Sequence, residues 1–189
     1  AEKWRVHRAP LHYCSHSLGP ILQLMQGDYI VRCTASGNRA TIIPHEGDGF
    51  IDMQVGLFQT KNGATIKVCR SSVATRRPAL CTYSVYGTKG SLESGRKWYD
   101  NTGMRYIEGE DEEGVAIEIS SSAKNAPEEA MLGGHGTSEY YLVRDFLDSI
   151  VNDTKPPIDI VRALDMSVPG LIAHECAKEG GVWKDIPLF

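Results

Sequence analysis

The chain has 189 residues, a length that suits one domain with a substantial core. Its net charge of −4, from 20 basic and 24 acidic residues, gives no electrostatic reason to expect nucleic acid or an anionic membrane as a partner. It shows neither the ~18 continuous apolar residues of a membrane span nor a signal peptide, so we expect a cytoplasmic protein.

The five cysteines are widely spaced and form no CxxC pair, so they give no sign of a disulfide framework. Cys33, Cys69 and Cys81 lie in apolar runs with strand character. In a reducing compartment, cysteine packs as a small hydrophobic side chain. We therefore expect reduced cysteines in the core.

The first predicted element is a helix. Residues 1–10 show no periodicity and form a lead-in, and apolar residues then recur at helical spacing from Leu11 to Met25. Gly19-Pro20 is expected to bend or interrupt this helix, and Gly27-Asp28 to end it.

Strands are predicted to follow, over residues 28–95. Lys61-Asn62-Gly63 predicts a hairpin turn because Asn-Gly accepts positive φ, and Gly87–Gly90 predicts a second turn. Sequential hairpins indicate an antiparallel sheet. The β-branched and aromatic segments are DYIVRCTASG, GFIDMQVGLFQT, GATIKVCRSS and LCTYSVYGT, with further short strands near 96–99, 103–108 and 115–119 and a loop over 120–134.

Two helices are predicted to close the chain. The first is capped by Thr137 or Ser138 and runs to Asn152. The second covers residues 160–179, with Asp159 as its cap and a kink at Pro169-Gly170. A helix, a meander of strands and two helices predict an α+β domain: one large, mostly antiparallel open sheet with helices packed on one face.

The stretch LHYCSHSLGP, residues 11–20, brings His12, Tyr13 and His16 close together in the sequence. His12 and His16 have the spacing of metal ligands on a helix, but the glutamate of an HExxH motif is absent and no third ligand is evident. Both could instead be packed or solvated histidines. They could also form an acid/base cluster, because imidazole titrates near neutral pH and a neighbouring tyrosine can share its proton.

Other polar residues give weaker indications. His135 lies in a Gly-Gly-His-Gly stretch before a predicted helix, which suits an anionic or hydroxyl-rich ligand or, equally, an exposed turn. Arg70, Arg76 and Arg77 could hold substrate oxygens or form surface pairs. No GxGxxG follows a strand, no GxxxxGK[ST] occurs, and GTKGSLESG predicts a hairpin.

Several stretches together resemble a known family. They are HYCSHSLGPIL, NGATIKVCRS, SVYGTKGSLES, GGHGTSEYYLVRDFLDSI and KPPIDIVRALDMSVPGLIAHECAKEGGVWKDIPLF, in this order over nearly the whole chain. This arrangement is similar to the C-terminal domain of the glucose-fructose oxidoreductase/inositol dehydrogenase/MocA family. The resemblance implies that a Rossmann domain binding NAD or NADP precedes residues 1–189, which would form the substrate-binding and oligomerisation domain, with a fold like the C-terminal domain of glyceraldehyde-3-phosphate dehydrogenase.

The resemblance also implies site residues. The family's dehydrogenases carry D-x-x-x-H, whose histidine falls on His16 and whose aspartate is replaced here by His12. The Tyr13-x-x-His16-x-Leu-Gly-Pro pattern and the later His135-Gly are similar to a branch containing NAD-dependent α-N-acetylgalactosaminidases. We therefore assign His16, Tyr13 and His12 as candidate catalytic residues and, as candidate substrate-binding residues, His135, Arg70, Ser17 and Arg76.

Three hypotheses follow. The first is the substrate domain of an NAD(P)-dependent oxidoreductase acting on a sugar, a polyol or a related CH–OH substrate. The second is the same domain in a redox-assisted glycosidase or lyase, and the third is a non-catalytic carbohydrate-binding or assembly module. These residues alone are expected to fold but to bind no cofactor or metal and to be inactive, because hydride chemistry belongs to the cofactor.

The sheet is also expected to mediate assembly. The predicted strands contain more apolar residues, among them Ile66, Val68, Val55 and Leu57, than the few helices can cover on both faces. An uncovered apolar face usually marks an interface. We therefore expect a homodimer or homotetramer built through the sheet.

Overall fold

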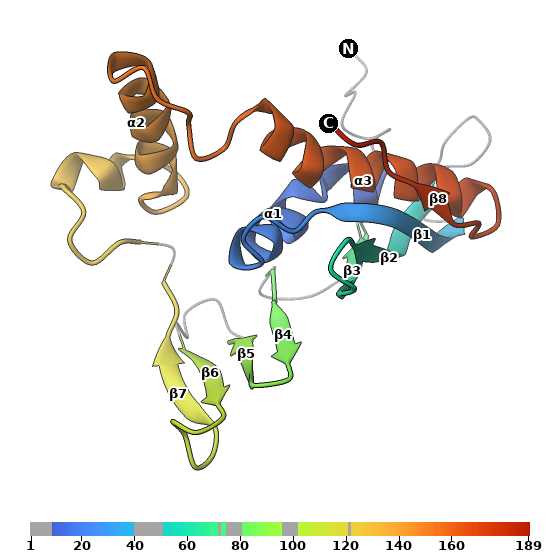
Figure 1. The fold of residues 1–189 in the computed structure, drawn as a ribbon, viewed down its shortest axis with the longest axis horizontal. Coiled ribbons are helices and arrows are strands. Elements are labelled where there is room, and N and C mark those ends of the chain that lie inside the picture. The colour runs from blue at the N-terminus through green and yellow to red at the C-terminus, as the bar shows by residue number, and fades with distance from the viewer. Residues whose placement is uncertain (1–8, 40–50, 72, 75–80, 96–101, 121) are drawn as a thin grey trace. The chain divides into compact units, whose positions relative to one another are not determined.

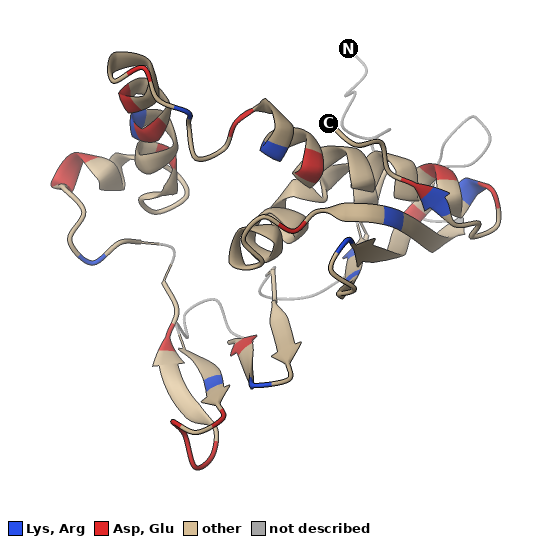
Figure 2. Ribbon diagram, in the orientation of Figure 1, with Lys and Arg blue, Asp and Glu red and all other residues tan. Residues whose placement is uncertain are grey.

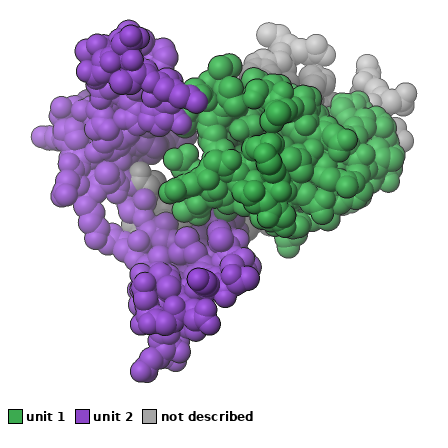
Figure 3. All heavy atoms as spheres, in the orientation of Figure 1, with its two compact units in different colours: residues 1–75, 158–189 green, residues 76–157 purple. Residues whose placement is uncertain are grey.

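The computed structural model describes residues 9–39, 51–71, 73–74, 81–95, 102–120 and 122–189. The chain divides into two compact units, shown in Figure 3. Unit 1 contains residues 1–75 and 158–189, and unit 2 contains residues 76–157.

Unit 1 is an antiparallel sheet packed against helices (Figure 1). Its strand order is β3-β2-β1-β8, and every neighbouring pair is antiparallel. The elements are the 3-10 helix η2 (Pro10–Tyr13), α1 (Ser15–Leu24), β1 (Ile30–Arg39), β2 (Ile51–Thr60), β3 (Thr65–Ser71), α3 (Ile160–Lys178) and β8 (Lys184–Asp185).

The turn between β2 and β3 confirms the predicted hairpin. Gly63 has φ +91°, a backbone conformation that glycine adopts without steric penalty. The Gly63 N–H donates to the Thr60 carbonyl at 3.1 Å, and the Asn62 N–H donates to the Asp28 carboxylate at 3.2 Å. The first bond closes the turn between β2 and β3, and the second ties the turn to the residue before Tyr29.

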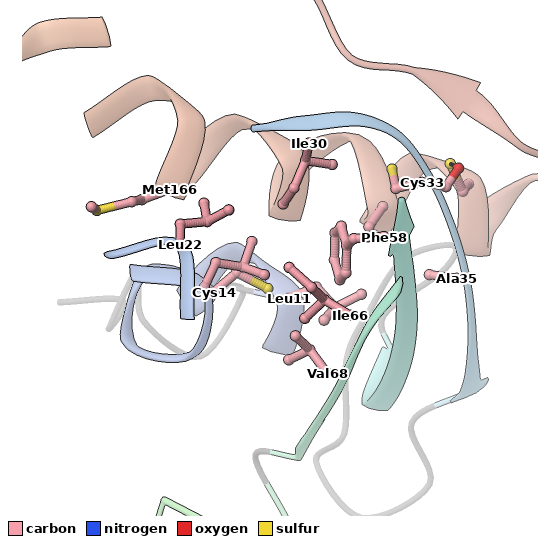
Figure 4. Packing of buried hydrophobic residues seen from close by; sticks show 13 residues of the cluster. Leu11, Cys14, Leu22, Ile30, Cys33, Ala35, Phe58, Ile66, Val68 and Met166 are labelled. Atoms are coloured by element: carbon pink, nitrogen blue, oxygen red, sulfur yellow. Dashed lines mark hydrogen bonds between the residues drawn. The ribbon is translucent and has the colours of Figure 1, made fainter. Parts of the chain in front are cut away.

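Strand β2 shows why the sheet has one covered face. Its side chains alternate, so Gln54 and Phe58 are fully buried while Val55 and Leu57 are each 37% exposed. The buried row meets η2, α1 and α3 in one hydrophobic core (Figure 4). The core consists of Leu11, Cys14, Leu18, Leu22, Ile30, Cys33, Ala35, Phe58, Ile66, Val68, Met166, Ala173 and Cys176.

Helix α3 is fixed at its start and in its middle. The Asp159 carboxylate accepts the Arg162 N–H at 2.8 Å, which confirms the predicted cap. The Arg162 guanidinium donates to the carbonyls of Leu22 and Asp28, so it ties α3 to the end of α1. At Gly170 the helix passes so close to η2 that a Cβ would overlap the carbonyl oxygen of Leu11.

The predicted helix from Leu11 to Met25 is wrong in one respect. A 3-10 turn, Pro10–Tyr13, comes first, and the α-helix begins only after Cys14. His12 and His16 therefore lie on different elements rather than one turn apart on a single helix. The predicted interruption at Gly19-Pro20 is absent, because α1 runs through both residues with Leu18 and Leu22 held in the core.

Unit 2 carries a second antiparallel sheet, of order β4-β5-β6-β7. The segment between β6 and β7 is acidic and includes Glu110, Asp111, Glu112 and Glu113 (Figure 2). The elements of unit 2 are β4 (Ser84–Gly87), β5 (Gly90–Ser94), β6 (Thr102–Ile107), β7 (Val115–Glu118), the 3-10 helix η3 (Glu128–Leu132) and α2 (Ser138–Val151).

The α+β class is thus confirmed, with a difference in sheet organisation. In the described part of the chain the strands form two sheets of four, rather than one large sheet. Local patterns identify strands and hairpins but not which outer strands pair across longer connections, and the pairing of β8 with β1 was not expected either. The predicted strand at 96–99 lies outside the described residues.

Two cysteines also differ from expectation. Cys14, Cys33 and Cys176 are buried, but Cys69 and Cys81 are exposed. On β3 the helix-facing positions are those of Ile66 and Val68, so the alternation turns Cys69 to the uncovered face. All five thiols are free, as expected for reduced cysteines.

Candidate functional site

Three of the candidate residues meet at the start of α1. The ring of Tyr13 lies 4.3 Å from that of His16, measured between centroids, with the planes tilted by 30°. The guanidinium carbon of Arg70 lies 5.0 Å from the centroid of the Tyr13 ring, within the range of a cation–π contact. A 3-10 turn, an α-helix and a strand thus bring together a phenol, an imidazole and a guanidinium.

Arg70 reaches this position because of the sheet register. It pairs with Gln54 across the β2–β3 ladder, and cross-strand partners share a face. Gln54 is fully buried on the face that the helices cover. Arg70 therefore projects from the covered face near the end of β3, toward the turn that carries Tyr13.

Gln54 joins the sheet to that turn and to α3. Its Oε1 accepts the Leu11 N–H at 3.0 Å, and its Nε2 lies 2.9 Å from Nδ1 of His174. The His174 ring meets the ring of His12 edge-on, with centroids 4.7 Å apart and an interplanar angle of 80°. His12 is therefore part of a polar array that reaches from η2 to α3, in which Gln54 is fully buried and both imidazoles are half-buried.

Burial sets the protonation of two groups here. It lowers the pKa of His174, and the charge of nearby His12 lowers it further. Burial also raises the pKa of the Cys14 thiol to about 12, although Arg70 opposes this shift. Cys14 is therefore a protonated core residue at neutral pH, which leaves the titratable chemistry to the imidazoles and the phenol.

The candidate site residues differ in their exposure to solvent. His16 is exposed, whereas His12, Tyr13, Ser17 and Arg70 are half-buried. The Ser17 N–H donates to the Cys14 carbonyl at 2.8 Å in the first turn of α1. Arg76 and Arg77 lie outside the described residues.

His135 belongs to unit 2, where it is 73% exposed. Its Nδ1 lies 2.6 Å from the Glu139 carboxylate, which also accepts the Gly134 N–H at 2.9 Å. These bonds lower the pKa of Glu139, the His135 contact first. A carboxylate thus already occupies part of the N-terminal end of α2, where the sequence suggested an anionic ligand. Thr137 is the N-cap residue of this helix, as predicted, but its side chain makes no capping hydrogen bond, because its Oγ1 accepts the Ala123 N–H instead.

Within the described ranges, no group of three or more His, Cys, Asp or Glu side chains is arranged to hold a metal ion. The helices of the same ranges also lack the combination of length and apolarity needed to cross a bilayer.

Sequence reasoning missed two members of the array, Gln54 and His174. Gln54 had a detectable signal, because it occupies the same strand face as Phe58 and is therefore a polar residue at an inward position. His174 had none. It stands in the middle of a helix 162 positions after His12, and only the packing of α3 against η2 brings the two rings together.

Solved structures with a similar fold include oxidoreductases. An oxidoreductase domain protein from Kribbella flavida is 21% identical with a TM-score of 0.68, over 92% of this chain and 48% of its own. An inositol dehydrogenase homolog from Azotobacter vinelandii, complexed with NADH and myo-inositol, is 20% identical with a TM-score of 0.62, over 92% and 48%. A levoglucosan dehydrogenase complexed with NADH and L-sorbose is 15% identical with a TM-score of 0.65, over 85% and 46%.

The chain therefore shares the fold of part of each of these proteins, and it spans about half of their length. The family model GFO_IDH_MocA_C, described as the C-terminal alpha/beta domain of an oxidoreductase family, matches residues 7–173. The protein belongs to this family. No curated protein matches the chain.

Proposed function

We propose that this chain is the substrate-binding domain of an NAD(P)-dependent oxidoreductase that oxidises a CH–OH group of a sugar, a polyol or a related compound. The observation that carries the proposal is the cluster of Tyr13, His16 and Arg70 at the covered face of the unit 1 sheet. Family membership supports the reaction class.

His16 is the proposed general base. Oxidation of an alcohol requires that its hydroxyl proton be taken up as the carbon loses hydride. A neutral imidazole can accept that proton at pH 7. His16 is exposed, so a substrate can reach it, and the Tyr13 ring lies against it and limits its orientation.

Arg70 and Tyr13 are the proposed binding groups. A guanidinium offers five N–H donors in a planar fork, which suits the oxygens of a polyhydroxylated substrate. The phenol adds a further donor and acceptor beside the imidazole. Ser17, Arg76 and His135 are proposed as additional substrate contacts, and His12 as a residue that assists His16.

The donor set fits a nicotinamide-dependent reaction. Bound NAD(P) would supply the hydride acceptor. The residues of this chain would bind the alcohol, orient it and remove its proton. The sequence contains no glycine-rich dinucleotide motif, so we propose that a preceding Rossmann domain holds the cofactor. The five free cysteines support a reducing compartment, in keeping with a cytoplasmic enzyme.

The second candidate is a redox-assisted glycosidase or lyase. The Tyr13-x-x-His16 spacing, the later His135-Gly136 and the replacement of the usual aspartate by His12 favour it. Transient oxidation would make a ring proton acidic, and a base such as His16 would remove it before the glycosidic bond breaks. The same cluster would therefore serve both reactions.

A substrate panel on the full-length protein tests these alternatives. We expect NAD(P)H to accumulate with at least one polyol or free sugar, and His16→Ala to abolish this accumulation while the folded state persists. Ser15→Ala, an exposed neighbour on the same helix, is the matched control. Release of an aryl group from aryl glycosides without net NADH formation would instead establish the glycosidase.

The third hypothesis, a non-catalytic carbohydrate-binding or assembly module, has its own outcome. It requires sugar binding by calorimetry in the full-length protein with neither dinucleotide binding nor turnover. That result would overturn the enzymatic proposal.

A further inference from the structure

We propose that Gln54 and His174 are positioning residues of the candidate site: Gln54 holds His174 as the neutral tautomer protonated on Nε2, and His174 in turn orients the ring of His12. The inference deepens the proposed function and rests on it for its kinetic readout only. It concerns two residues that touch the candidate catalytic turn from β2 and α3.

The orientation of the Gln54 amide is fixed by the backbone. The Leu11 N–H is a donor, so the atom 3.0 Å from it must be the amide oxygen. A flipped amide would place NH₂ against N–H and leave two donors facing each other in a fully buried site. The amide nitrogen must therefore be the atom directed at α3.

That orientation fixes the tautomer of His174. An amide nitrogen can only donate, so Nδ1 of His174, 2.9 Å away, must accept and cannot carry a proton. The single proton of the neutral ring is then on Nε2. An imidazolium would carry a proton on both nitrogens and would break this bond.

The surroundings of His174 agree with this geometry. The His174 ring faces His12 of η2 and Gln54 of β2. On its own helix it lies near Glu175 and Lys178. Burial and His12 act together to lower the pKa of His174, the direction that the hydrogen bond also requires.

The array reaches the site through η2. A fixed ring on α3 packs edge-on against His12, and the same amide that fixes it also anchors Leu11, the residue before His12. The residue after His12 is Tyr13, whose ring contacts His16 and Arg70. Gln54 is moreover the cross-strand partner of Arg70. One buried side chain thus sets both the turn and the strand that present the candidate groups.

The substitution Gln54→Glu tests the inference with little change in shape. A carboxylate still accepts the Leu11 N–H, but its second oxygen can only accept, so it should draw a proton onto Nδ1 of His174. Gln59→Glu, on the same strand but the opposite face, adds the same charge and is the matched control.

Two measurements on the full-length protein decide the outcome. By ¹⁵N NMR at pH 7, wild-type His174 should be unprotonated at Nδ1 and protonated at Nε2, and Gln54→Glu should protonate Nδ1 while Gln59→Glu does not. In the pH profile of kcat, Gln54→Glu should move the acid limb by about half a pH unit or more, with KM within about twofold. If Gln54 had a purely structural role, the acid limb of the kcat profile would stay at the wild-type pH.

Each remaining outcome has a defined meaning. A proton on Nδ1 of wild-type His174 would overturn the inference without any variant, and this arm applies even if Gln54→Glu does not fold. A reversed tautomer with an unmoved kcat profile would overturn it as well. If the full-length protein shows no turnover, the proposed function fails, and the inference is then judged on NMR alone: His12 must lose its fixed contact with the His174 ring in Gln54→Glu.

Discussion

The ring of Tyr13 lies against the ring of His16, with centroids 4.3 Å apart, although the two residues belong to different helical elements. The 3-10 turn ends at Tyr13 and the α-helix begins at Ser15, so the contact spans the junction between them. The phenol and the imidazole face each other across this junction, and Arg70 contacts the phenol from the sheet.

The proposed role of His16 as general base predicts that its loss lowers activity more than the loss of Tyr13. In the full-length protein, His16→Ala should lower kcat/KM, because a positioned base is lost. The loss should correspond to about 3–5 kcal/mol of transition-state stabilisation. Tyr13→Phe should have a smaller effect, since it keeps the ring contact and removes one hydroxyl. Steady-state kinetics against Ser15→Ala provides the measurement. Wild-type turnover in His16→Ala would mean that the base is another residue.

The close approach of α3 to η2 predicts a stability difference between two helical glycines. A Cβ on Gly170 would overlap the Leu11 carbonyl oxygen and lie 2.8 Å from Cβ of Cys14, so Gly170→Ala should destabilise the fold by about 1–3 kcal/mol. At Gly19 the nearest atom is Sδ of Met166 at 3.4 Å, an ordinary contact. Gly19→Ala should therefore be neutral or stabilise by up to about 1 kcal/mol. Urea denaturation of both variants tests the pair, and equal losses would contradict the packing at Gly170.

His174 predicts a pH dependence of stability. Its pKa is lowered in the folded state, so below its ordinary value of 6.5 the unfolded chain binds more protons than the folded one. The free energy of unfolding should therefore decrease as pH falls below 6.5, toward the lower folded pKa. Denaturation at pH 7.5 and pH 5 should show a smaller decrease in His174→Gln than in wild type. Ser167→Gln, an exposed residue of the same helix, should retain the wild-type decrease.

The thiols predict a two-class reaction pattern. Cys69 and Cys81 are exposed, whereas Cys14, Cys33 and Cys176 are buried, and burial also raises the pKa of Cys14 to about 12. In a Leu57→Lys variant that does not assemble through the sheet, a disulfide reagent at pH 8 should modify two thiols rapidly and the other three only after unfolding. Replacing Cys69 and Cys81 with serine should remove the rapid phase. A third fast thiol in the folded protein would contradict the burial of the core cysteines.

The uncovered face of the unit 1 sheet predicts assembly. Met53, Val55 and Leu57 are each at least 36% exposed on alternate positions of β2, which gives this face an apolar row. Light scattering of the full-length protein should show a dimer or tetramer, and Leu57→Lys should reduce the mass toward the monomer. Asn62→Lys adds the same charge in the β2–β3 turn and should leave the mass unchanged. A wild-type monomer at high concentration would exclude assembly through this face.

The sequence alone was enough to predict the features that depend on interactions between neighbouring residues. The Asn62-Gly63 turn, the Asp159 cap and the antiparallel hairpins depend on residues a few positions apart, and they follow from backbone preferences and short-range hydrogen bonds. The α+β class follows from the order of these elements. The grouping of Tyr13 with His16 could also be predicted, because the two residues are close in the chain.

Only the tertiary structure decided which distant residues complete the site. Arg70 meets Tyr13 through the β2–β3 register, and His174 meets His12 because Gly170 lets α3 approach η2. The burial of Gln54 and the exposure of Cys69 likewise depend on which face of the sheet the helices cover. These contacts join residues far apart in sequence. Packing selects them, and the local patterns that indicate which side chains turn inward do not indicate which distant residues meet.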